Sequence, residues 1–178
     1  MIIETEPADI ICVSGSGFIS SAIQFVEGSE ISHIAGSVCI NDYIVEAHID
    51  GVHARSLNEY ADGRCKIAVF RNIKLDKRTK VRIAEEALRF VNDKYGVIKI
   101  LAHLIDRTIF RGAYVVRRIC GLSNFPICSY LWAKAYYDCT LYKFGCEVNA
   151  AEPSDMYNWC LSNSQDWKCV YELNYYKG

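Results

Sequence analysis

The alternation of apolar and polar residues predicts strands first, close to the N-terminus. Residues 10–13 form a short β-branched run that ends at the glycine- and serine-rich stretch 14–17, a pattern typical of a buried strand leading into a tight turn. Apolar residues then recur at helical spacing over residues 18–26. The chain is therefore expected to open as a strand, a turn and a short helix.

Three further strands are expected in the next part of the chain. Each is short, largely apolar and bounded by turn residues, and together they cover residues 34–40, 43–47 and 65–71. Asn41-Asp42 provides the turn between the first two, and the block predicts an antiparallel meander. Ser56 and Glu59 have the spacing of a capping box, which opens a short helical turn.

The second half of the chain is predicted to be mainly helical. Residues 76–95 form the clearest helix, with Gly96 as a stop and one apolar stripe made of Val81, Ala84, Leu88, Val91 and Tyr95. Residues 127–141 again have helical periodicity. The tail predicts a short helix that begins after Glu152-Pro153, followed by a strand over residues 168–173.

The segment at about residues 98–125 is predicted to be a helical, arginine-containing insertion. Its first part, residues 98–119, is apolar with interspersed arginines. The favoured interpretation is that these arginines lie on a solvated face of the insertion. The alternative is a basic, apolar lid or lipid-facing surface, which would allow membrane contact through residues 98–119.

Length and composition place the chain among ordinary globular domains. Its 178 residues correspond to one domain at about 150 residues per domain. Hydrophobic residues make up 51% and charged residues 23%, which excludes a disordered chain. The formal net charge of -1 offers no global attraction for nucleic acid, so no nucleic-acid partner is expected. No signal peptide or membrane-spanning stretch is recognised, and a cytoplasmic protein is expected.

Cysteine is the unusual residue, with nine copies in the chain. The odd count leaves at least one thiol free in a monomer, and no pair has the C-x-x-C spacing of a zinc knuckle or redox motif. No His or Cys spacing fits a closed zinc site either, so neither a metal nor another cofactor is expected. Most of the cysteines are expected to be reduced and buried.

One cysteine, one histidine and one glutamate are candidates for nucleophilic chemistry. Cys128 follows Pro126-Ile127 and opens a predicted helix, where unpaired N–H groups and the helix dipole favour a thiolate. Among the four histidines, His33 is preferred as the base because a strand holds it more rigidly than a turn holds His48 or His53. Glu46 on the next strand would lie near the start of the His33 strand and orient the imidazole. Residues of these types more often have structural roles.

The order and flanks of these residues resemble the permuted branch of the NlpC/P60 papain-like superfamily, particularly the YiiX/YaeF-like cysteine amidases. The resemblance spans nearly the whole chain and is carried by residues 9–13, 32–38, 43–47, 51–52, 56–60, 95–96, 127–132 and 152–156. Its most specific elements are the Ser32-His33 pair at a strand start, the Val45-Glu46-Ala47 strand and the Cys128-Ser129 pair at a helix start. In that branch the histidine and its acidic partner precede the cysteine, as they do here.

The resemblance implies both a fold and an activity. The fold is α+β, a circularly permuted papain-like domain over residues 1–178 in which an antiparallel sheet or small barrel packs against helices. Cys128 is implied to be the nucleophile, His33 the base and then the acid, and Glu46 the residue that orients His33. The expected function is a cysteine amidase or peptidase that forms a thioester acyl-enzyme on a small peptide or amino-acid amide. The alternatives are a hydrolase or acyltransferase that acts on a lipid or acyl substrate, and a catalytically inactive binding module.

Overall fold

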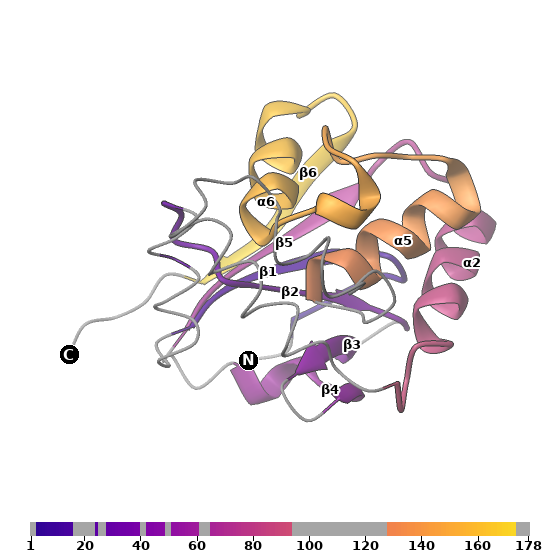
Figure 1. Cartoon of the computed structure of the whole chain (residues 1–178), viewed down its shortest axis with the longest axis horizontal. Helices are drawn as coiled ribbons and strands as arrows, with labels where there is room; N and C mark the ends of the chain where they lie inside the picture. Colours follow the sequence, from indigo (N-terminus) through magenta and orange to yellow (C-terminus); the bar gives the residue numbers. More distant parts are fainter. Residues whose placement is uncertain are drawn as a thin grey trace, which may run out of the picture.

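A six-stranded antiparallel sheet forms the centre of the molecule, in the order β4-β3-β2-β1-β5-β6 (Figure 1). The computed structural model describes residues 3–15, 24, 28–39, 42–48, 51–60, 65–93 and 128–173. Within these ranges the strands are β1 (Ile10–Ser14), β2 (His33–Ser37), β3 (Tyr43–His48), β4 (Gly51–Ser56), β5 (Lys66–Asn72) and β6 (Trp167–Leu173). The expected α+β class with an antiparallel sheet is confirmed.

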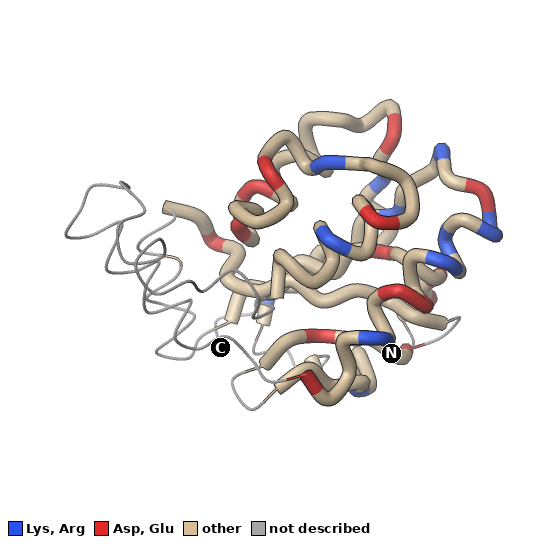
Figure 2. Tube along the Cα trace, turned by 45° about the vertical axis from the view of Figure 1, so that its right-hand side comes forward, with Lys and Arg blue, Asp and Glu red and all other residues tan. Residues whose placement is uncertain are grey.

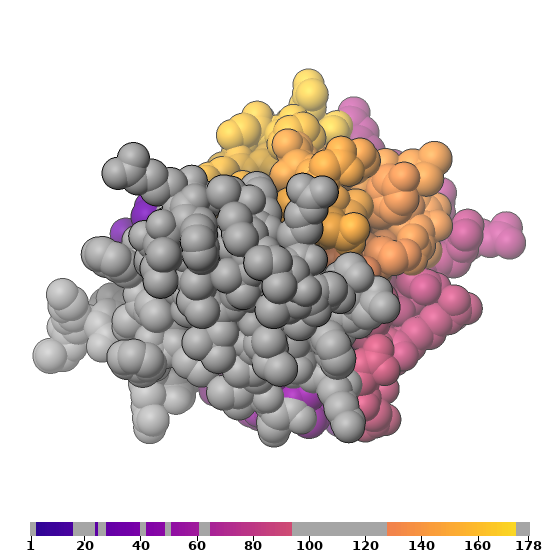
Figure 3. Space-filling model, in the orientation of Figure 1, coloured from indigo at the N-terminus to yellow at the C-terminus, as the bar shows by residue number. Residues whose placement is uncertain are grey.

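Helices pack against the sheet and against one another (Figure 1). They are α2 (Lys77–Leu88), α5 (Cys128–Thr140) and α6 (Pro153–Ser162), with short 3₁₀ turns η1 (Leu57–Tyr60) and η3 (Val148–Ala150). Helices α2 and α5 pack on each other and their surfaces adjoin (Figure 3), α5 also contacts β2 and β3, and α6 contacts β6. Helix α5 therefore contacts both α2 and the strands β2 and β3, which carry the candidate histidine and glutamate.

The strand order corrects the predicted meander. Strands β1 to β4 follow one another as neighbours, but β5 does not continue from β4, because it pairs with β1 in the register Ile10↔Phe70. Residues 10–13 are fully buried because both faces of the sheet are covered: Ile10 and Cys12 belong to one apolar cluster, and Ile11 and Val13 to another. Strand β4 was not predicted, because its sequence from Gly51 to Ser56 holds a single large aliphatic residue, Val52, and lies at the edge of the sheet.

Helix α2 begins where expected but presents a partly different face to the core. Asp76 is its N-cap and accepts a hydrogen bond from the Thr79 backbone N–H at 2.8 Å. The predicted stripe is right in part: Ala84 is buried and Val91 packs against the core, whereas Val81 and Leu88 are exposed and the other buried residues of the helix are Ile83 and Ala87. Tyr95 lies outside the described residues. The small side chains of Ala84 and Ala87 are compatible with close packing of α2 on α5. The helix also ends at Leu88, earlier than predicted.

The remaining expected elements are confirmed where the structure describes them. Helix α5 matches the predicted helix over 127–141, and α6 and β6 match the predicted tail. The expected helix over 18–26 lies outside the described residues except for Gln24, and the insertion over 98–125 lies wholly outside them. No helix in the described ranges is long and apolar enough to cross a membrane. Acidic and basic residues are interspersed along the described chain (Figure 2).

The cysteines depart from one expectation. All eight that the structure describes are free thiols, in agreement with a reduced protein. However, only Cys12, Cys128 and Cys160 are buried, while Cys169 is exposed and the others are half-buried. The expectation that most would be buried is therefore wrong, because a side chain this small is also accommodated at strand and helix ends. Cys120 lies outside the described residues.

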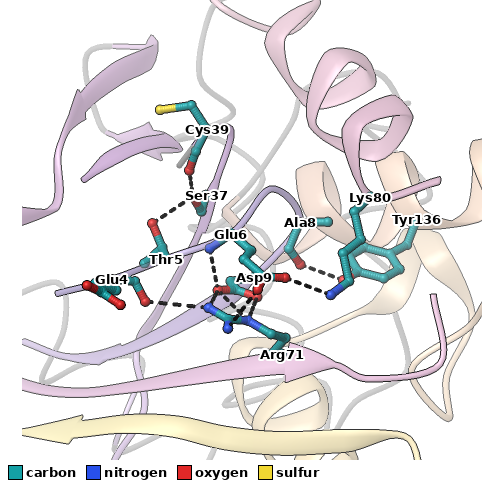
Figure 4. Close-up of polar contacts among 10 residues, drawn as sticks. All are labelled: Glu4, Thr5, Glu6, Ala8, Asp9, Ser37, Cys39, Arg71, Lys80 and Tyr136. Atoms are coloured by element: carbon teal, nitrogen blue, oxygen red, sulfur yellow. Dashed lines mark hydrogen bonds and ion pairs between the residues drawn. The ribbon is translucent and has the colours of Figure 1, made fainter. Parts of the chain in front are cut away.

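A buried ion pair holds the segment before β1 against the sheet (Figure 4). The Arg71 guanidinium on β5 donates through Nη2 to Asp9 Oδ2 at 2.7 Å and through Nε to Oδ1 at 3.0 Å. Its Nη1 lies 3.0 Å from Glu6 Oε1, and Lys80 Nζ on α2 donates to Glu6 Oε2 at 3.0 Å. Burial raises the pKa of Asp9, although the Arg71 hydrogen bonds oppose the change. The cluster ties the N-terminal segment to both β5 and α2.

Arg71→Ala is expected to lower the free energy of unfolding by about 2–3 kcal/mol, because it leaves the buried Asp9 carboxylate without its cationic partner. Urea denaturation of the purified variant measures the loss. The matched control is Arg78→Ala on the exposed face of α2, which should change the free energy by less than about 0.5 kcal/mol. Equal effects of the two substitutions would contradict a specific role for the ion pair.

Candidate active site

The sheet register brings His33 and Glu46 together. His33 is the first residue of β2, and β2 pairs with β3 so that Ala35 lies opposite Glu46. His33 and Ala35 are two residues apart and share one face of the sheet, so His33 and Glu46 are diagonal neighbours. His33 Nε2 and Glu46 Oε2 are 2.7 Å apart. The hairpin predicted from the sequence places these two side chains in contact, as expected.

The Glu46 carboxylate is buried but well supplied with donors. Its side chain is 1% exposed, and the Tyr60 hydroxyl donates to Oε2 at 2.5 Å. Arg55 Nε lies 3.8 Å from Oε1. Burial alone would raise the pKa of Glu46, but hydrogen bonds from His33 and Tyr60 and the nearby positive charges lower it to about 2. Glu46 is therefore an ionised acceptor for His33 at neutral pH.

Cys128 is the first residue of α5, and the packing of that helix sets its position. Trp132, one turn further along, lies over Gly36 of β2 and donates through its indole N–H to the Val45 carbonyl at 2.9 Å. A Cβ at Gly36 would overlap the indole ring. Ser129 donates through its hydroxyl to the Ala151 carbonyl at 2.7 Å. These contacts seat the start of α5 against the strands that carry His33 and Glu46.

His33 lies between the cysteine and the glutamate. Its side chain is 17% exposed, whereas Cys128 is 4% exposed. Burial lowers the pKa of His33, but its interactions with Cys128 and with the Glu46 carboxylate outweigh burial and raise it to about 10. Since Nε2 faces Glu46, Nδ1 is the ring nitrogen left for Cys128. The structure thus brings all three candidate residues into one row, with an imidazolium favoured in the middle.

The other histidines occupy different positions. His48 ends β3, and His53 lies on β4 directly opposite Glu46 in the strand pairing. His103 lies outside the described residues. Sequence reasoning missed Tyr60 and Arg55, the two further side chains at Glu46. The sequence pointed to the segment that contains Tyr60 through the capping turn beginning at Ser56 and through the family resemblance over residues 56–60, but neither indicates what the turn contacts.

Comparison with known proteins supports the architecture. No family model matches the chain, and no curated protein matches its sequence. Among solved structures, the chain is similar to the crystal structure of metalloprotein YiiX from Escherichia coli O157:H7 (DUF1105), with a TM-score of 0.64. The chain has a YiiX-like fold. The likeness covers 96% of this chain and 99% of that chain at 15% sequence identity, so it concerns the fold alone.

YiiX is described as a metalloprotein, which raises the question of whether the residues of this chain fit a metal ion. Three or four His, Cys, Asp or Glu ligands surround a typical protein-bound transition metal. In the described ranges, no group of three or more such side chains is arranged to hold a metal ion. The part of the chain that the structure describes therefore does not fit a metal site.

Proposed function

We propose that this chain is a cysteine hydrolase of the circularly permuted papain-like type, acting on an amide or peptide bond. One observation carries the proposal: His33 donates to a buried, ionised Glu46 while it also interacts with Cys128. A nucleophile, a base beside it and a third group that orients the base form the arrangement that activates Ser and Cys nucleophiles on unrelated folds. The YiiX-like fold is consistent with the family resemblance of the sequence.

The proposed reaction is acyl transfer through a thioester. His33 holds the proton of Cys128, so the sulfur attacks the substrate carbonyl as a thiolate and its electron pair forms the C–S bond. The carbonyl oxygen takes the negative charge, and the backbone N–H of Cys128 at the helix start is one donor that stabilises it. When the tetrahedral intermediate collapses, the C–N bond breaks and His33 gives its proton to the leaving amine.

Hydrolysis then restores the enzyme. Neutral His33 takes a proton from a water molecule, and the resulting hydroxide attacks the thioester carbonyl. The C–S bond breaks, the acid is released, and Cys128 and His33 return to the thiolate–imidazolium pair. Throughout the cycle Glu46 stays ionised and holds the Nε2 side of the ring, which keeps Nδ1 toward the sulfur. The alternative acyl or lipid substrate depends on residues 98–119, which lie outside the described residues.

Selective alkylation tests the proposal without a known substrate. Iodoacetamide at pH 6 is expected to modify Cys128 roughly tenfold faster or more than any other thiol, because the positively charged His33 beside it favours attack by its sulfur. Exposure alone predicts the opposite order, since Cys128 is 4% exposed and Cys169 is exposed. Burial raises the pKa of Cys169, which keeps it protonated at this pH. Peptide mass spectrometry over a time course gives the rate at each cysteine.

The pH profile sharpens the same experiment. His33 stays protonated up to about pH 10 and Glu46 stays ionised down to about pH 2, so both charges persist between these limits. The rate advantage of Cys128 over the other thiols should therefore persist between pH 8 and pH 6, the range in which an ordinary thiol slows about tenfold per pH unit below its pKa. Uniform slow labelling with ordinary pH dependence at every cysteine would overturn the proposal and support a binding module.

A further inference from the structure

We propose that Tyr60 is a positioning residue of this site: its hydroxyl fixes the Glu46 carboxylate in the orientation that directs His33 toward Cys128. The inference rests on the proposed function, because it assigns Tyr60 a part in the same reaction. Tyr60 acts through Glu46, whose Oε2 its hydroxyl contacts.

Both donors converge on one oxygen of Glu46. The Tyr60 hydroxyl lies 2.5 Å from Oε2, and His33 Nε2 lies 2.7 Å from the same atom. The groups that face Glu46 are His33 from β2, Arg55 and His53 from β4, and Tyr60 from η1. Arg55 is nearest to the other oxygen, at 3.8 Å, which is beyond a direct hydrogen bond. Tyr60 is therefore the close donor besides His33 in the described surroundings.

Tyr60 is suited to this role because it remains a donor. Burial and the neighbouring Glu46 charge both raise the pKa of its hydroxyl far above the ordinary value, so it stays protonated at neutral pH. A neutral donor does not compete with His33 for the carboxylate charge as a lysine or arginine in direct contact would. The hydroxyl can fix the carboxylate while leaving its charge to stabilise the imidazolium.

The turn that carries Tyr60 is anchored to the strand that carries Glu46. Asp42, one residue before β3, accepts hydrogen bonds from the Ser56 hydroxyl and the Asn58 amide, each at 2.6 Å. The Asp42 carbonyl accepts from the Leu57 backbone N–H, also at 2.6 Å, and the Leu57 side chain is fully buried. Tyr60 and Glu46 thus share one rigid support, and Tyr60 packs against the same apolar cluster as Leu57.

This support matters because a carboxylate can rotate. Glu46 has three side-chain torsions, and with His33 as its only hydrogen-bond partner the carboxylate and the imidazole could turn together away from Cys128. A second donor on Oε2 removes that freedom. Small losses of alignment between a base and a nucleophile lower rates strongly, since proton transfer requires hydrogen-bond distance.

Tyr60→Phe is the test, because it removes one oxygen and keeps the ring. Two readouts are expected to change. The first is the titration midpoint of the Glu46 carboxyl group, followed by ¹³C NMR of glutamate-labelled protein, which should rise by about 1–2 pH units. The iodoacetamide rate at Cys128 at pH 6 should fall roughly tenfold. Tyr43→Phe on β3 is the matched control, since Tyr43 is 57% exposed, and neither readout should change. Circular dichroism and thermal melting confirm that each variant is folded.

Ser56→Ala provides a second route to the same question. It loosens the anchor of η1 and leaves Tyr60 and Glu46 intact, so both readouts should move in the same direction by less than in Tyr60→Phe. The inference is overturned if Tyr60→Phe leaves the alkylation rate unchanged, whether or not the Glu46 midpoint shifts. If wild-type Cys128 reacts no faster than it does in His33→Ala, the proposed function itself fails, and a Glu46 midpoint that still shifts would identify Tyr60 as a structural partner only.

Discussion

Cys128→Ala is expected to abolish turnover, because it removes the sulfur to which the proposed reaction transfers the acyl group. The backbone donors at the start of α5 remain, but they stabilise an oxyanion only after a nucleophile has attacked. The loss should therefore reach the uncatalysed background for any substrate that the wild-type protein hydrolyses. Cys139→Ala, further along α5, is the matched control and should retain full activity, since Cys139 is a half-buried thiol outside the row of three residues.

The other two residues of the row should give graded losses. His33→Ala is expected to lower kcat/KM by about 10²–10⁴-fold, the usual contribution of a positioned acid–base group. Glu46→Gln keeps the imidazole and removes only the group that orients it and supports its charge. Its kcat/KM should therefore lie between those of wild type and His33→Ala. His48→Ala at the exposed end of β3 is the histidine control. Because the three residues act as a unit, combining the substitutions should add little to the loss in Cys128→Ala.

A substrate panel makes these measurements possible and separates the two substrate classes. Short peptides with a fluorogenic amide leaving group represent peptide substrates, and fatty-acyl esters with a chromogenic leaving group represent acyl substrates. Amide hydrolysis that depends on Cys128 and His33 would support an amidase or peptidase, and ester hydrolysis alone would support the acyl alternative. Full activity of Cys128→Ala and Cys128→Ser on either class would overturn the assignment of Cys128.

Trp132→Ala is expected to destabilise the fold by about 3–5 kcal/mol, the cost of removing a large buried aromatic side chain. Trp132 is fully buried, and its indole N–H donates to the Val45 carbonyl, which would be left without that donor. Guanidinium denaturation measures the change, with Leu141→Ala as the control. Leu141 follows α5 and is 73% exposed, so its truncation should change stability by less than about 0.5 kcal/mol.

Gly36 on β2 forms the strand side of the contact with Trp132. A Cβ at this position would overlap the Trp132 ring, so Gly36→Ala forces the helix or the strand to move and should cost about 1–3 kcal/mol. In a Trp132→Leu background the smaller side chain leaves room, and the added cost of Gly36→Ala should largely disappear. Additive losses in this double-mutant cycle would contradict the proposed direct packing of helix on strand.

The seating of α5 also bears on chemistry. Cys128 lies one turn before Trp132, and α5 is remote from His33 in the sequence. The packing of α5 on the sheet therefore sets the distance between Cys128 and His33. If Gly36→Ala displaces α5 while the protein remains folded, the alkylation rate at Cys128 should fall even though all three proposed site residues are present. An unchanged rate in a measurably destabilised Gly36→Ala variant would mean that Trp132 contributes to stability without positioning Cys128.

Local sequence patterns were sufficient for most elements but not for their partners. The buried run at residues 10–13 identifies a strand because its apolar residues are continuous, yet nothing local decides that β5 pairs with it. On α2 the helical period is clear, but Val81 and Leu88 are exposed because the helix packs through the face that carries Ala84 and Ala87. Strand β4 escaped prediction because edge strands need little apolar surface.

The proposed site shows the same division. The contact between His33 and Glu46 followed from a two-stranded hairpin, whose register depends on a short turn and on alternation within each strand. Tyr60 was missed because its contact with Glu46 depends on how η1 folds back over the hairpin, which is set by hydrogen bonds to Asp42. A turn motif in the sequence predicts a turn, but it contains no information on which side chain the turn approaches.

The sequence by itself determined the class of the fold, the identity of the candidate residues and their order along the chain, because these follow from local periodicity and motif. The tertiary structure decided that Cys128, more than 80 residues after Glu46, lies beside His33. It did so through long-range packing, above all Trp132 on Gly36, and through burial that raises the pKa of some groups while paired charges lower that of Glu46. Distances between remote segments and the local dielectric are properties of the packed molecule, which local sequence patterns do not reveal.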